Sequence, residues 1–397
     1  MSNDLPTMIP QRSSLRPESD SPVGLVLSGG GARGAFQVGV WKVLREEAGG
    51  FGTQPDVVSG TSCGAINAAL IAAGVSPDDM LEFWLRIADD PPVVANETFF
   101  EAVHRAISKL LLLYPFPGLV GGAREVRLLS DLFRRHRWWL RGGFDAMVAA
   151  YWFTARYGVV SSVLTQIPTP YVFSVDKLKD HLERAVGAPD IRGTDVRLAI
   201  NTVDARTGKV VRFVNHPPQK HPRSSSRHYR YEPVITFDMI LASAAIPLLF
   251  NPVRIGSMQL WDGGILVNSP LAPAVALGAR RIVPVLVTSR TPPAEVMLDT
   301  FGEGMERVVD TFLENAYRND RKLLLDRNAL ADRLEDDDLV RVELFRAIRP
   351  RSGSTFNAGS YLYFEREALL SMHEAGVKAA RDWLDRGPEL DSRWTPD

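Results

Sequence analysis

A short glycine-flanked turn carries the first residue suited to covalent catalysis. Residues 60–64 read GTSCG and fit the G-x-S-x-G pattern, in which a sharp strand-to-helix turn exposes a serine hydroxyl. Crowding in such a turn requires Gly60 and Gly64. Ser62 would lie at a helix N-terminus, where free amide groups favour negative charge on its oxygen. The pattern predicts a nucleophilic Ser62, with a plain helix-capping serine as the alternative.

Cys63 is the competing nucleophile, because a thiol at a helix N-terminus can have a lowered pKa. It lies beside the apex of the turn rather than at it. Cys63 is also the only cysteine, so no internal disulfide can form and a cysteine-built zinc site lacks ligands. We therefore assign the nucleophile to Ser62 and expect no metal site.

A second glycine turn lies closer to the N-terminus, where residues 29–34 read GGGARG. It satisfies the pattern G-x-G-x-x-G between a strand and a helix, so one interpretation is a dinucleotide-binding site. That reading requires an acidic residue at the end of the next strand. The strand predicted over residues 55–59 ends at Ser59, and Asp56 lies at its beginning. The sequence therefore disfavours a dinucleotide cofactor.

The same turn suits the oxyanion of an acyl-transfer reaction better. The glycines Gly29, Gly30 and Gly31 let several backbone N–H groups converge on one oxygen, and Arg33 adds positive charge nearby. A tight turn that only allows close helix packing is the plainer alternative.

An aspartate on a third glycine turn, Asp262 before Gly263 and Gly264, follows the strand predicted over residues 258–261. Such a turn is also common as plain turn chemistry. A serine nucleophile needs a base, and none of the seven histidines lies in a comparable turn; these are His104, His136, His181, His216, His221, His228 and His373. An aspartate can act directly if burial raises its pKa. The candidate dyad is therefore Ser62 with Asp262.

Strands alternate with helices in the segments that must position these turns. The apolar runs predict strands over residues 23–28, 55–59, 196–203, 209–214 and 280–287. Helical periodicity is found over residues 35–47, 65–73, 76–87, 174–186, 239–245, 301–334 and 364–386. This alternation predicts an α/β fold, a three-layer α/β/α sandwich with a largely parallel central sheet.

Less regular segments interrupt this pattern. We expect a disordered leader over residues 1–22, a catalytic domain over 23–290 and a mainly helical C-terminal part over 291–397 packed on it. Residues 91–170 are rich in aromatic and basic side chains and read as an insertion or lid, and the polar run 216–231 as a mobile loop.

The three turns together, in this order and spacing, resemble the patatin-like phospholipase family. Similarity continues in residues 243–252 before the aspartate turn and in residues 268–270 after it, so the likeness covers about residues 23–287. The resemblance implies a lipid acyl hydrolase with a Ser-Asp dyad, no catalytic histidine and no calcium or other cofactor. By matching positions it makes Ser62 the nucleophile, Asp262 the base, and Gly30, Gly31 and Arg33 the oxyanion-hole region.

Composition narrows the class of partner. Forty-six basic and 47 acidic residues give a net charge of -1, so the overall charge does not indicate nucleic-acid binding. No window of eighteen apolar residues is free of charge, and residues 1–21 lack the apolar run of a secretory signal. We expect a cytoplasmic protein with reversible membrane contact.

A local basic segment suggests how that contact forms. Residues 124–157 hold seven arginines against three acidic residues, a local charge of +4, interleaved with Trp and Tyr side chains. Each basic residue near an anionic bilayer contributes roughly 1 kcal/mol, so this segment is a candidate membrane-docking surface. The alternative places the aromatic rings in a core beneath solvated arginines.

We expect phospholipids or lysophospholipids as substrates, cleaved through an acyl-enzyme. A catalytically silent, membrane-associated binding protein on the same fold is the main alternative. A dinucleotide-dependent oxidoreductase is the third.

Overall fold

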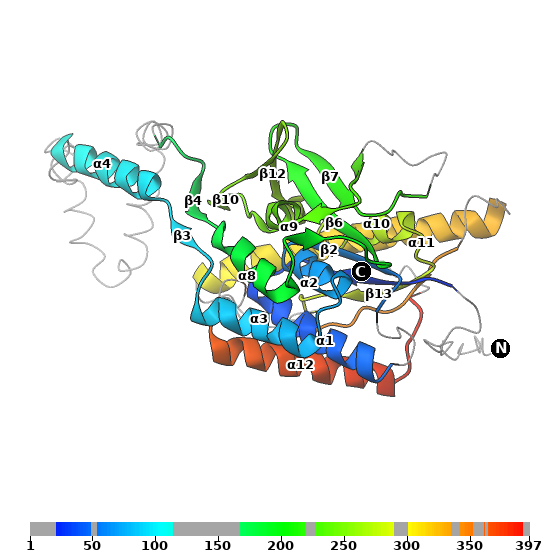
Figure 1. Cartoon of the computed structure of the whole chain (residues 1–397). Helices are drawn as coiled ribbons and strands as arrows, with labels where there is room; N and C mark the ends of the chain where they lie inside the picture. The colour runs from blue at the N-terminus through cyan, green and yellow to red at the C-terminus, as the bar shows by residue number, and fades with distance from the viewer. Residues whose placement is uncertain are drawn as a thin grey trace, which may run out of the picture. The chain divides into compact units, whose positions relative to one another are not determined.

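The strand-turn-helix unit occurs twice at the start of the fold (Figure 1). Strand β1 (Val23–Leu27) leads through the short 3-10 helix η1 (Gly31–Arg33) into α1 (Gly34–Glu46), and β2 (Val57–Thr61) leads directly to α2 (Cys63–Ala72). The two strands pair in parallel. Both glycine-rich turns therefore follow the carboxyl ends of adjacent strands.

The computed structural model describes residues 21–48, 54–113, 167–219, 228–289, 301–334, 341–351, 361 and 364–391. Contacts between Cα atoms divide the chain into two compact units, the first comprising residues 1–93, 175–247 and 252–397.

A nine-stranded sheet forms the centre of the first unit, among the residues described. Its main path runs β11-β12-β6-β2-β1-β13-β14, and β7 pairs with β6 and β8. The further strands are β6 (Arg197–Asp204), β7 (Lys209–Val214), β8 (Tyr229–Tyr231), β11 (Val253–Ile255), β12 (Met258–Asp262), β13 (Arg281–Val285) and β14 (Glu343–Leu344). Pairings along β6-β2-β1-β13-β14 are parallel, whereas β12 and β7 run antiparallel to β6. The predicted largely parallel sheet is confirmed.

Helices cover both faces of this sheet. On one face, α10 (Leu271–Ala276) and α11 (Phe301–Leu334) bury Leu271, Tyr317 and Leu324 against strand residues such as Val26 and Ala199. On the other, α2 packs on the strands beneath a layer formed by α1, α3 (Pro77–Asp89) and α12 (Arg366–Asp385) (Figure 1). Helices thus lie on both faces of the largely parallel sheet, in agreement with the predicted α/β sandwich, and the C-terminal region is helical as predicted.

Local signals explain several element boundaries. Ser76 caps α3 by accepting a hydrogen bond from the Asp79 N–H at 3.1 Å, and Pro77 occupies the first helical turn, as the sequence predicts. The connection between β6 and β7 is a tight hairpin in which the Gly208 N–H donates to the Asp204 carbonyl at 2.8 Å. Gly208 has a φ of 65°, the left-handed region that a glycine adopts without strain.

Two predicted boundaries were wrong. The segment 216–231 was expected to be a loop throughout, yet β8 pairs with β7 over residues 229–231, and residues 220–227 lie outside the described part. The helix expected over residues 174–186 begins later, as α8 (Lys177–Val186), because Ser174 ends a strand of the second unit. Alternating aromatic and basic side chains gave no apolar periodicity by which to recognise β8.

The second unit comprises residues 94–174 and 248–251. Its described elements are β3 (Val94–Ala95), α4 (Glu97–Leu113), β4 (Tyr171–Ser174) and β10 (Leu248–Phe250), with sheet order β10-β4-β3. Phe100 packs near Phe173, with ring centroids 6.3 Å apart. The basic and aromatic segment 124–157 lies outside the described residues.

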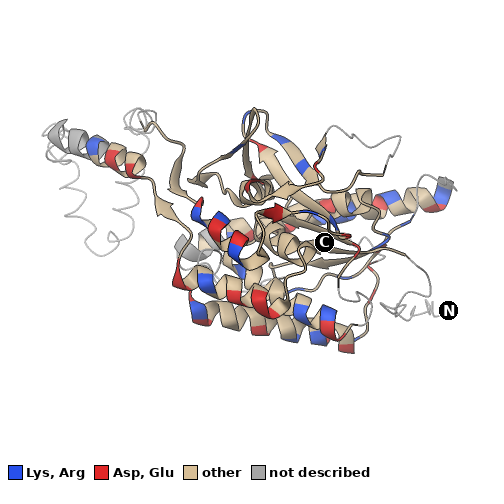
Figure 2. Cartoon of the chain, viewed as in Figure 1, with Lys and Arg blue, Asp and Glu red and all other residues tan. Residues whose placement is uncertain are grey.

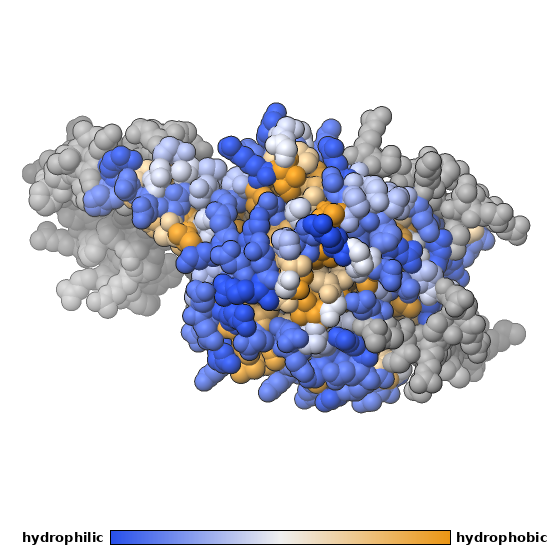
Figure 3. Space-filling model, in the orientation of Figure 1, coloured by the Kyte–Doolittle hydropathy of each residue, from blue (hydrophilic) through white to orange (hydrophobic). Residues whose placement is uncertain are grey.

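Charges of both signs are interspersed along the helices of the first unit (Figure 2), consistent with the near-zero net charge. The viewed surface of this unit is mostly hydrophilic, with smaller apolar patches (Figure 3). Within the described ranges, no helix combines the length and apolar character needed to cross a bilayer.

Candidate active site

Ser62 lies at a strained turn between β2 and α2. Its backbone has φ 55° and ψ -126°, a conformation that residues with a side chain rarely adopt. A Cβ atom on Gly60 would lie 2.1 Å from the Gly64 carbonyl oxygen, and one on Gly64 would lie 2.4 Å from the Leu27 carbonyl oxygen. Both flanking glycines are therefore required by backbone contact, as the G-x-S-x-G pattern predicts.

Hydrogen bonds from neighbouring elements hold this turn. The Ser62 N–H donates to the Ser243 hydroxyl at 3.0 Å, and that hydroxyl donates to the Asn201 carbonyl of β6 at 2.6 Å. The Thr61 hydroxyl donates to the Val267 carbonyl at 2.9 Å. Because these partners come from three different segments, the turn is fixed by tertiary structure and not by its own sequence alone.

Strand β6 brings Asp262 to Ser62. Two consecutive residues of β6 make the connection, since Asn201 pairs with Thr61 of β2 and Thr202 pairs with Asp262 at the end of β12. The Ser62 side chain lies against the Asp262 carboxylate and favours its charged form. Only 7% of Ser62 and 5% of Asp262 is exposed. The structure thus joins the two residues that the sequence analysis placed in one dyad.

Burial governs the electrostatics of Asp262. Loss of solvent raises its pKa to about 6, although the hydrogen bond from the Gly264 N–H at 2.7 Å and the nearby Ser62 side chain favour the charged form. A Cβ atom on Gly263 would lie 2.4 Å from the Asn201 carbonyl oxygen, so this glycine permits the close turn. A carboxylate that titrates near neutrality is suited to accept a proton.

The described histidines of the first unit contact other groups. His181 lies near Asp90, with 3.5 Å between Nε2 and Oδ2, His216 contacts Asn215, and His228 contacts the Val210 carbonyl. His373 lies in α12, while His136 and His221 fall outside the described part. Across the described ranges, no group of three His, Cys, Asp or Glu side chains is placed to hold a metal ion.

Cys63 is fully enclosed at the start of α2. Burial raises the pKa of its thiol, and the nearby Asp262 charge raises it further. Its sulfur lies 3.7 Å from the Ser28 carbonyl oxygen. A neutral, inaccessible thiol is a poor nucleophile, so the geometry favours Ser62 over Cys63.

The glycine loop after β1 lies directly against Ser62. A Cβ atom on Gly29 would lie 3.1 Å from the Ser62 Cβ and 2.6 Å from the Asn268 Oδ1. The Gly29 N–H donates to Asn268, at 3.2 Å to its carbonyl and 3.1 Å to its Oδ1, and the Gly30 amide is hydrogen-bonded to the Cys63 sulfur, a weak acceptor. Gly29 is therefore placed beside the nucleophile, with its own amide already bonded.

The side chain of Arg33 lies away from solvent, with 1% exposure. Its Nη1 is 2.9 Å from the Asp310 Oδ1 of α11, and its guanidinium carbon lies 3.7 Å from the centre of the Tyr361 ring. The positive charge expected beside the oxyanion is thus paired with a carboxylate from the C-terminal part.

A buried polar network supports the start of α1. The Asn67 amide donates to the Gly34 carbonyl and to the Gln37 Oε1, both at 2.9 Å, and accepts the Trp84 indole N–H at 2.9 Å. Gln37 in turn donates to the Ser28 carbonyl at 2.7 Å. This network connects α2, the helix that begins after Ser62, to α1, the helix that follows the glycine loop.

Several of these positioning residues were not assigned a role from the sequence. Ser243 and Asn268 lie in the two segments that carried the family likeness, so their presence was noted, but not their contacts. Asn201, Asp310 and Tyr361 belong to no motif. Their contribution depends on strand register and on packing between distant segments, which local spacing does not encode.

Several known proteins are similar to this chain. The family model of the patatin-like phospholipases matches residues 25–275. A patatin-like phospholipase domain-containing protein of Caenorhabditis elegans is 51% identical over 112 residues, 28% of this chain and 7% of that protein. Lysophospholipase nte1 of Aspergillus terreus is 58% identical over 50 residues, 13% of this chain and 3% of that protein. The matched segments thus span a small part of both relatives.

Two solved structures are also similar. VipD from Legionella pneumophila is 15% identical with a TM-score of 0.38, over 98% of this chain and 73% of that one. The ExoU–SpcU complex from the type III secretion system of Pseudomonas aeruginosa includes a chain with 18% identity and a TM-score of 0.23, over 93% and 61% of the two chains. Because the family model covers well over half of the chain, this protein belongs to the patatin-like phospholipase family.

Proposed function

We propose that this protein hydrolyses fatty acyl esters of phospholipids or lysophospholipids through a Ser62–Asp262 dyad. The observation that carries the proposal is the Ser62 hydroxyl beside a buried carboxylate whose pKa is raised to about 6. Family membership supports lipid esters as the substrate class. The lysophospholipase among the relatives supports the same class.

In the first half of the reaction, Asp262 takes the Ser62 proton while the Ser62 oxygen attacks the acyl carbonyl carbon. The tetrahedral intermediate then expels the alcohol of the lipid, which leaves with the proton held by Asp262. The result is an acyl-enzyme on Ser62. In the second half, Asp262 accepts a proton from water, hydroxide oxygen attacks the acyl carbon, and the fatty acid leaves as Ser62 regains its proton.

We assign the oxyanion to the glycine loop that lies against Ser62. The Gly29 amide is bonded to two oxygens of Asn268, whereas the Gly30 amide has only the weakly accepting Cys63 sulfur beside it, so the amides of Gly30 and Gly31 are the donors in this proposal. The positive end of α2 adds to them because Ser62 is the residue that precedes its first turn. Removing one good donor from such a site typically costs roughly 3 kcal/mol of barrier.

The decisive experiment is intact-mass measurement after exposure to a long-chain fluorophosphonate. The wild-type protein should gain one adduct, whereas Ser62→Ala should gain none. Ser59→Ala is the matched control, because Ser59 is buried in β2, the strand that leads to Ser62, and its hydroxyl has no partner among the described residues. This variant should label as the wild type does.

Asp262→Asn should remain folded and lose acyl-ester turnover, because the amide cannot accept the Ser62 proton. Retained turnover in either Ser62→Ala or Asp262→Asn would contradict the dyad. Wild-type protein that binds vesicles but gains no adduct would instead favour a catalytically silent binding protein on this fold.

A further inference from the structure

The most deeply buried charge beside the glycine loop belongs to Arg33. A guanidinium with only 1% exposure needs a counterion and acceptors for its other N–H groups, because an unpaired charge is costly inside a protein. Asp310 of α11 supplies the counterion at 2.9 Å, and the Val287 carbonyl accepts from the same Nη1 at 3.3 Å. The loop is thereby linked to a helix that begins far along the chain.

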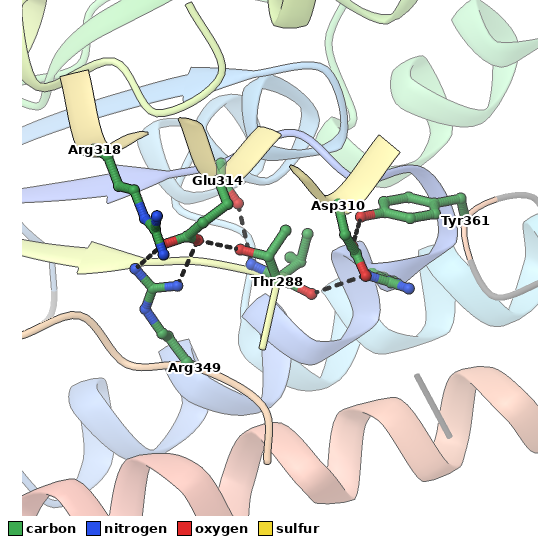
Figure 4. Close-up of polar contacts among 9 residues, drawn as sticks. Thr288, Asp310, Glu314, Arg318, Arg349 and Tyr361 are labelled. Carbon is green, nitrogen blue, oxygen red and sulfur yellow. Dashed lines mark hydrogen bonds and ion pairs between the residues drawn. The ribbon is translucent and has the colours of Figure 1, made fainter. Parts of the chain in front are cut away.

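Tyr361 closes the same contact from a different segment. Its ring stacks on the Arg33 guanidinium, and its hydroxyl donates to the Asp310 carboxylate (Figure 4). Its backbone carbonyl accepts the Ala32 N–H at 2.9 Å. One residue therefore contacts both the side chain and the backbone of the loop.

The backbone contact leaves no room for variation at Gly31. This residue has a φ of +57°, and a Cβ atom there would lie 2.0 Å from the Tyr361 carbonyl oxygen. On the other side of the loop, a Cβ atom on Gly30 would lie 2.1 Å from the Val287 Cγ2. The two glycines assigned to the oxyanion are thus held between Val287 and Tyr361.

A second ion pair anchors α11 one turn further along. Glu314 accepts two hydrogen bonds from Arg349, at 2.6 and 3.2 Å, and one from the Thr288 hydroxyl at 3.0 Å (Figure 4). Thr288 directly follows Val287. The position of α11, and with it the Asp310 carboxylate, is therefore fixed to the segment that holds the loop.

From these contacts we infer that Asp310 and Tyr361 are positioning residues for the oxyanion loop. The inference rests on the proposed function, and it assigns neither residue a contact with substrate. Through Arg33 and the Ala32 amide they hold Gly30 and Gly31 in the conformation that aims their N–H groups. Both residues lie beyond residue 275, where the family match ends, so the C-terminal part of this chain completes the site.

Purely structural contacts would stabilise the fold without favouring any step of the reaction. A positioning role makes a sharper prediction, because the oxyanion forms only in the transition state. Loss of the contact should lower kcat and leave KM nearly unchanged. Small displacements of reacting groups can lower rates by about 100-fold, which sets the expected scale.

Two variants and one control test this inference. Tyr361→Phe removes only the hydroxyl and keeps the ring and the backbone contact. Asp310→Asn removes the counterion of Arg33. Asp391→Asn is the matched control, because Asp391 pairs with Arg321, eleven residues beyond Asp310 in α11, and both side chains are largely buried at 15% and 18% exposure.

The measurements are kcat and KM with a soluble acyl ester, the rate of fluorophosphonate labelling at Ser62, and urea unfolding of each variant. We expect Asp310→Asn to lower kcat and the labelling rate about 10- to 100-fold, Tyr361→Phe to lower them less, and KM to stay within about twofold. In a protein that already carries Arg33→Ala, adding Asp310→Asn should lower kcat little further, because the two residues act through one contact. Asp391→Asn should keep wild-type rates.

Wild-type kcat in folded Tyr361→Phe and Asp310→Asn would overturn the positioning role while leaving the dyad intact. Equal losses in Asp391→Asn would also overturn it, because a general loss of stability would then explain the data. An unlabelled wild-type protein would overturn the proposed function itself, and the positioning role with it.

Discussion

The Ser62 hydroxyl lies beside the carboxylate of Asp262, a residue with only 5% exposure. Two strands that are not neighbours in sequence bring these residues together, because adjacent residues of β6 pair with the ends of β2 and β12. The same burial that raises the pKa of Asp262 to about 6 makes it a base at neutral pH.

The dyad predicts an acid limb in the pH profile of the reaction. Asp262 must be deprotonated to accept the Ser62 proton, and its pKa lies at about 6. The value of kcat/KM should therefore fall as pH decreases through about 6 and reach a plateau above it. Steady-state rates with a soluble ester at constant ionic strength would measure this limb. A rate that stays flat down to pH 4.5 would contradict Asp262 as the base.

Asp262→Asn should stabilise the fold at neutral pH while it abolishes turnover. The carboxyl has a higher pKa in the folded protein, about 6, than its ordinary value of 3.8, so folding takes up a proton and stability falls as pH rises between these values. Removing the charge should raise the free energy of unfolding by about 1 to 3 kcal/mol at pH 7 and change it little at pH 3.5.

Urea unfolding of both proteins at pH 7 and pH 3.5 checks this. Asp320 of α11 also has a pKa raised to about 6 by burial, so the wild type alone would not isolate one group. The difference in unfolding free energy between the wild type and Asp262→Asn isolates Asp262, because both proteins contain Asp320. We compare the free energy of unfolding of Asp262→Asn with that of the wild type at each pH. A stability advantage of the variant that is smaller at pH 7 than at pH 3.5 would contradict the predicted sign.

Ser243→Ala should impair catalysis although the residue is not one of the dyad. The substitution leaves the Ser62 N–H and the Asn201 carbonyl without their shared partner, and each is buried. A buried donor without an acceptor typically costs about 1 to 3 kcal/mol, so we expect lower stability and a slower labelling rate at Ser62.

Ser269→Ala is the control for this variant. Ser269 is equally buried, and its hydroxyl has no partner in the described part of the chain. It should keep the wild-type labelling rate, with urea unfolding measured alongside. If Ser243→Ala labels as fast as the control, the Ser243 contact does not position the nucleophile.

Local chemistry explains why the pairing of Ser62 with Asp262 could be predicted from sequence. Ser62 and Asp262 lie on glycine turns whose steric requirements are confined to a few residues, and each follows a short strand. The parallel sheet follows from alternating apolar strands and amphipathic helices. These signals span fewer than about a dozen residues each, the range in which periodicity is informative.

The parts that were missed depend on contacts between distant segments. Nothing near Arg33 indicates that its charge pairs with Asp310 rather than facing an oxyanion, because the two are 277 residues apart. Strand β8 was missed because it gains its stability from pairing with β7 and not from an apolar pattern. Register and ion pairs of this kind are properties of the folded chain.

The basic and aromatic segment 124–157 gives a prediction that is independent of the site's geometry. Seven arginines against three acidic residues should draw it to anionic bilayers, each basic residue contributing roughly 1 kcal/mol near the surface. Sedimentation with vesicles of phosphatidylserine and phosphatidylcholine should show binding that weakens as salt is raised, and little binding to phosphatidylcholine alone. Replacing Arg134, Arg135 and Arg137 with Gln should reduce sedimentation while leaving hydrolysis of a soluble ester unchanged. Binding that is insensitive to salt, or equal for the Gln variant, would place these arginines outside the membrane contact and favour aromatic rings in a core.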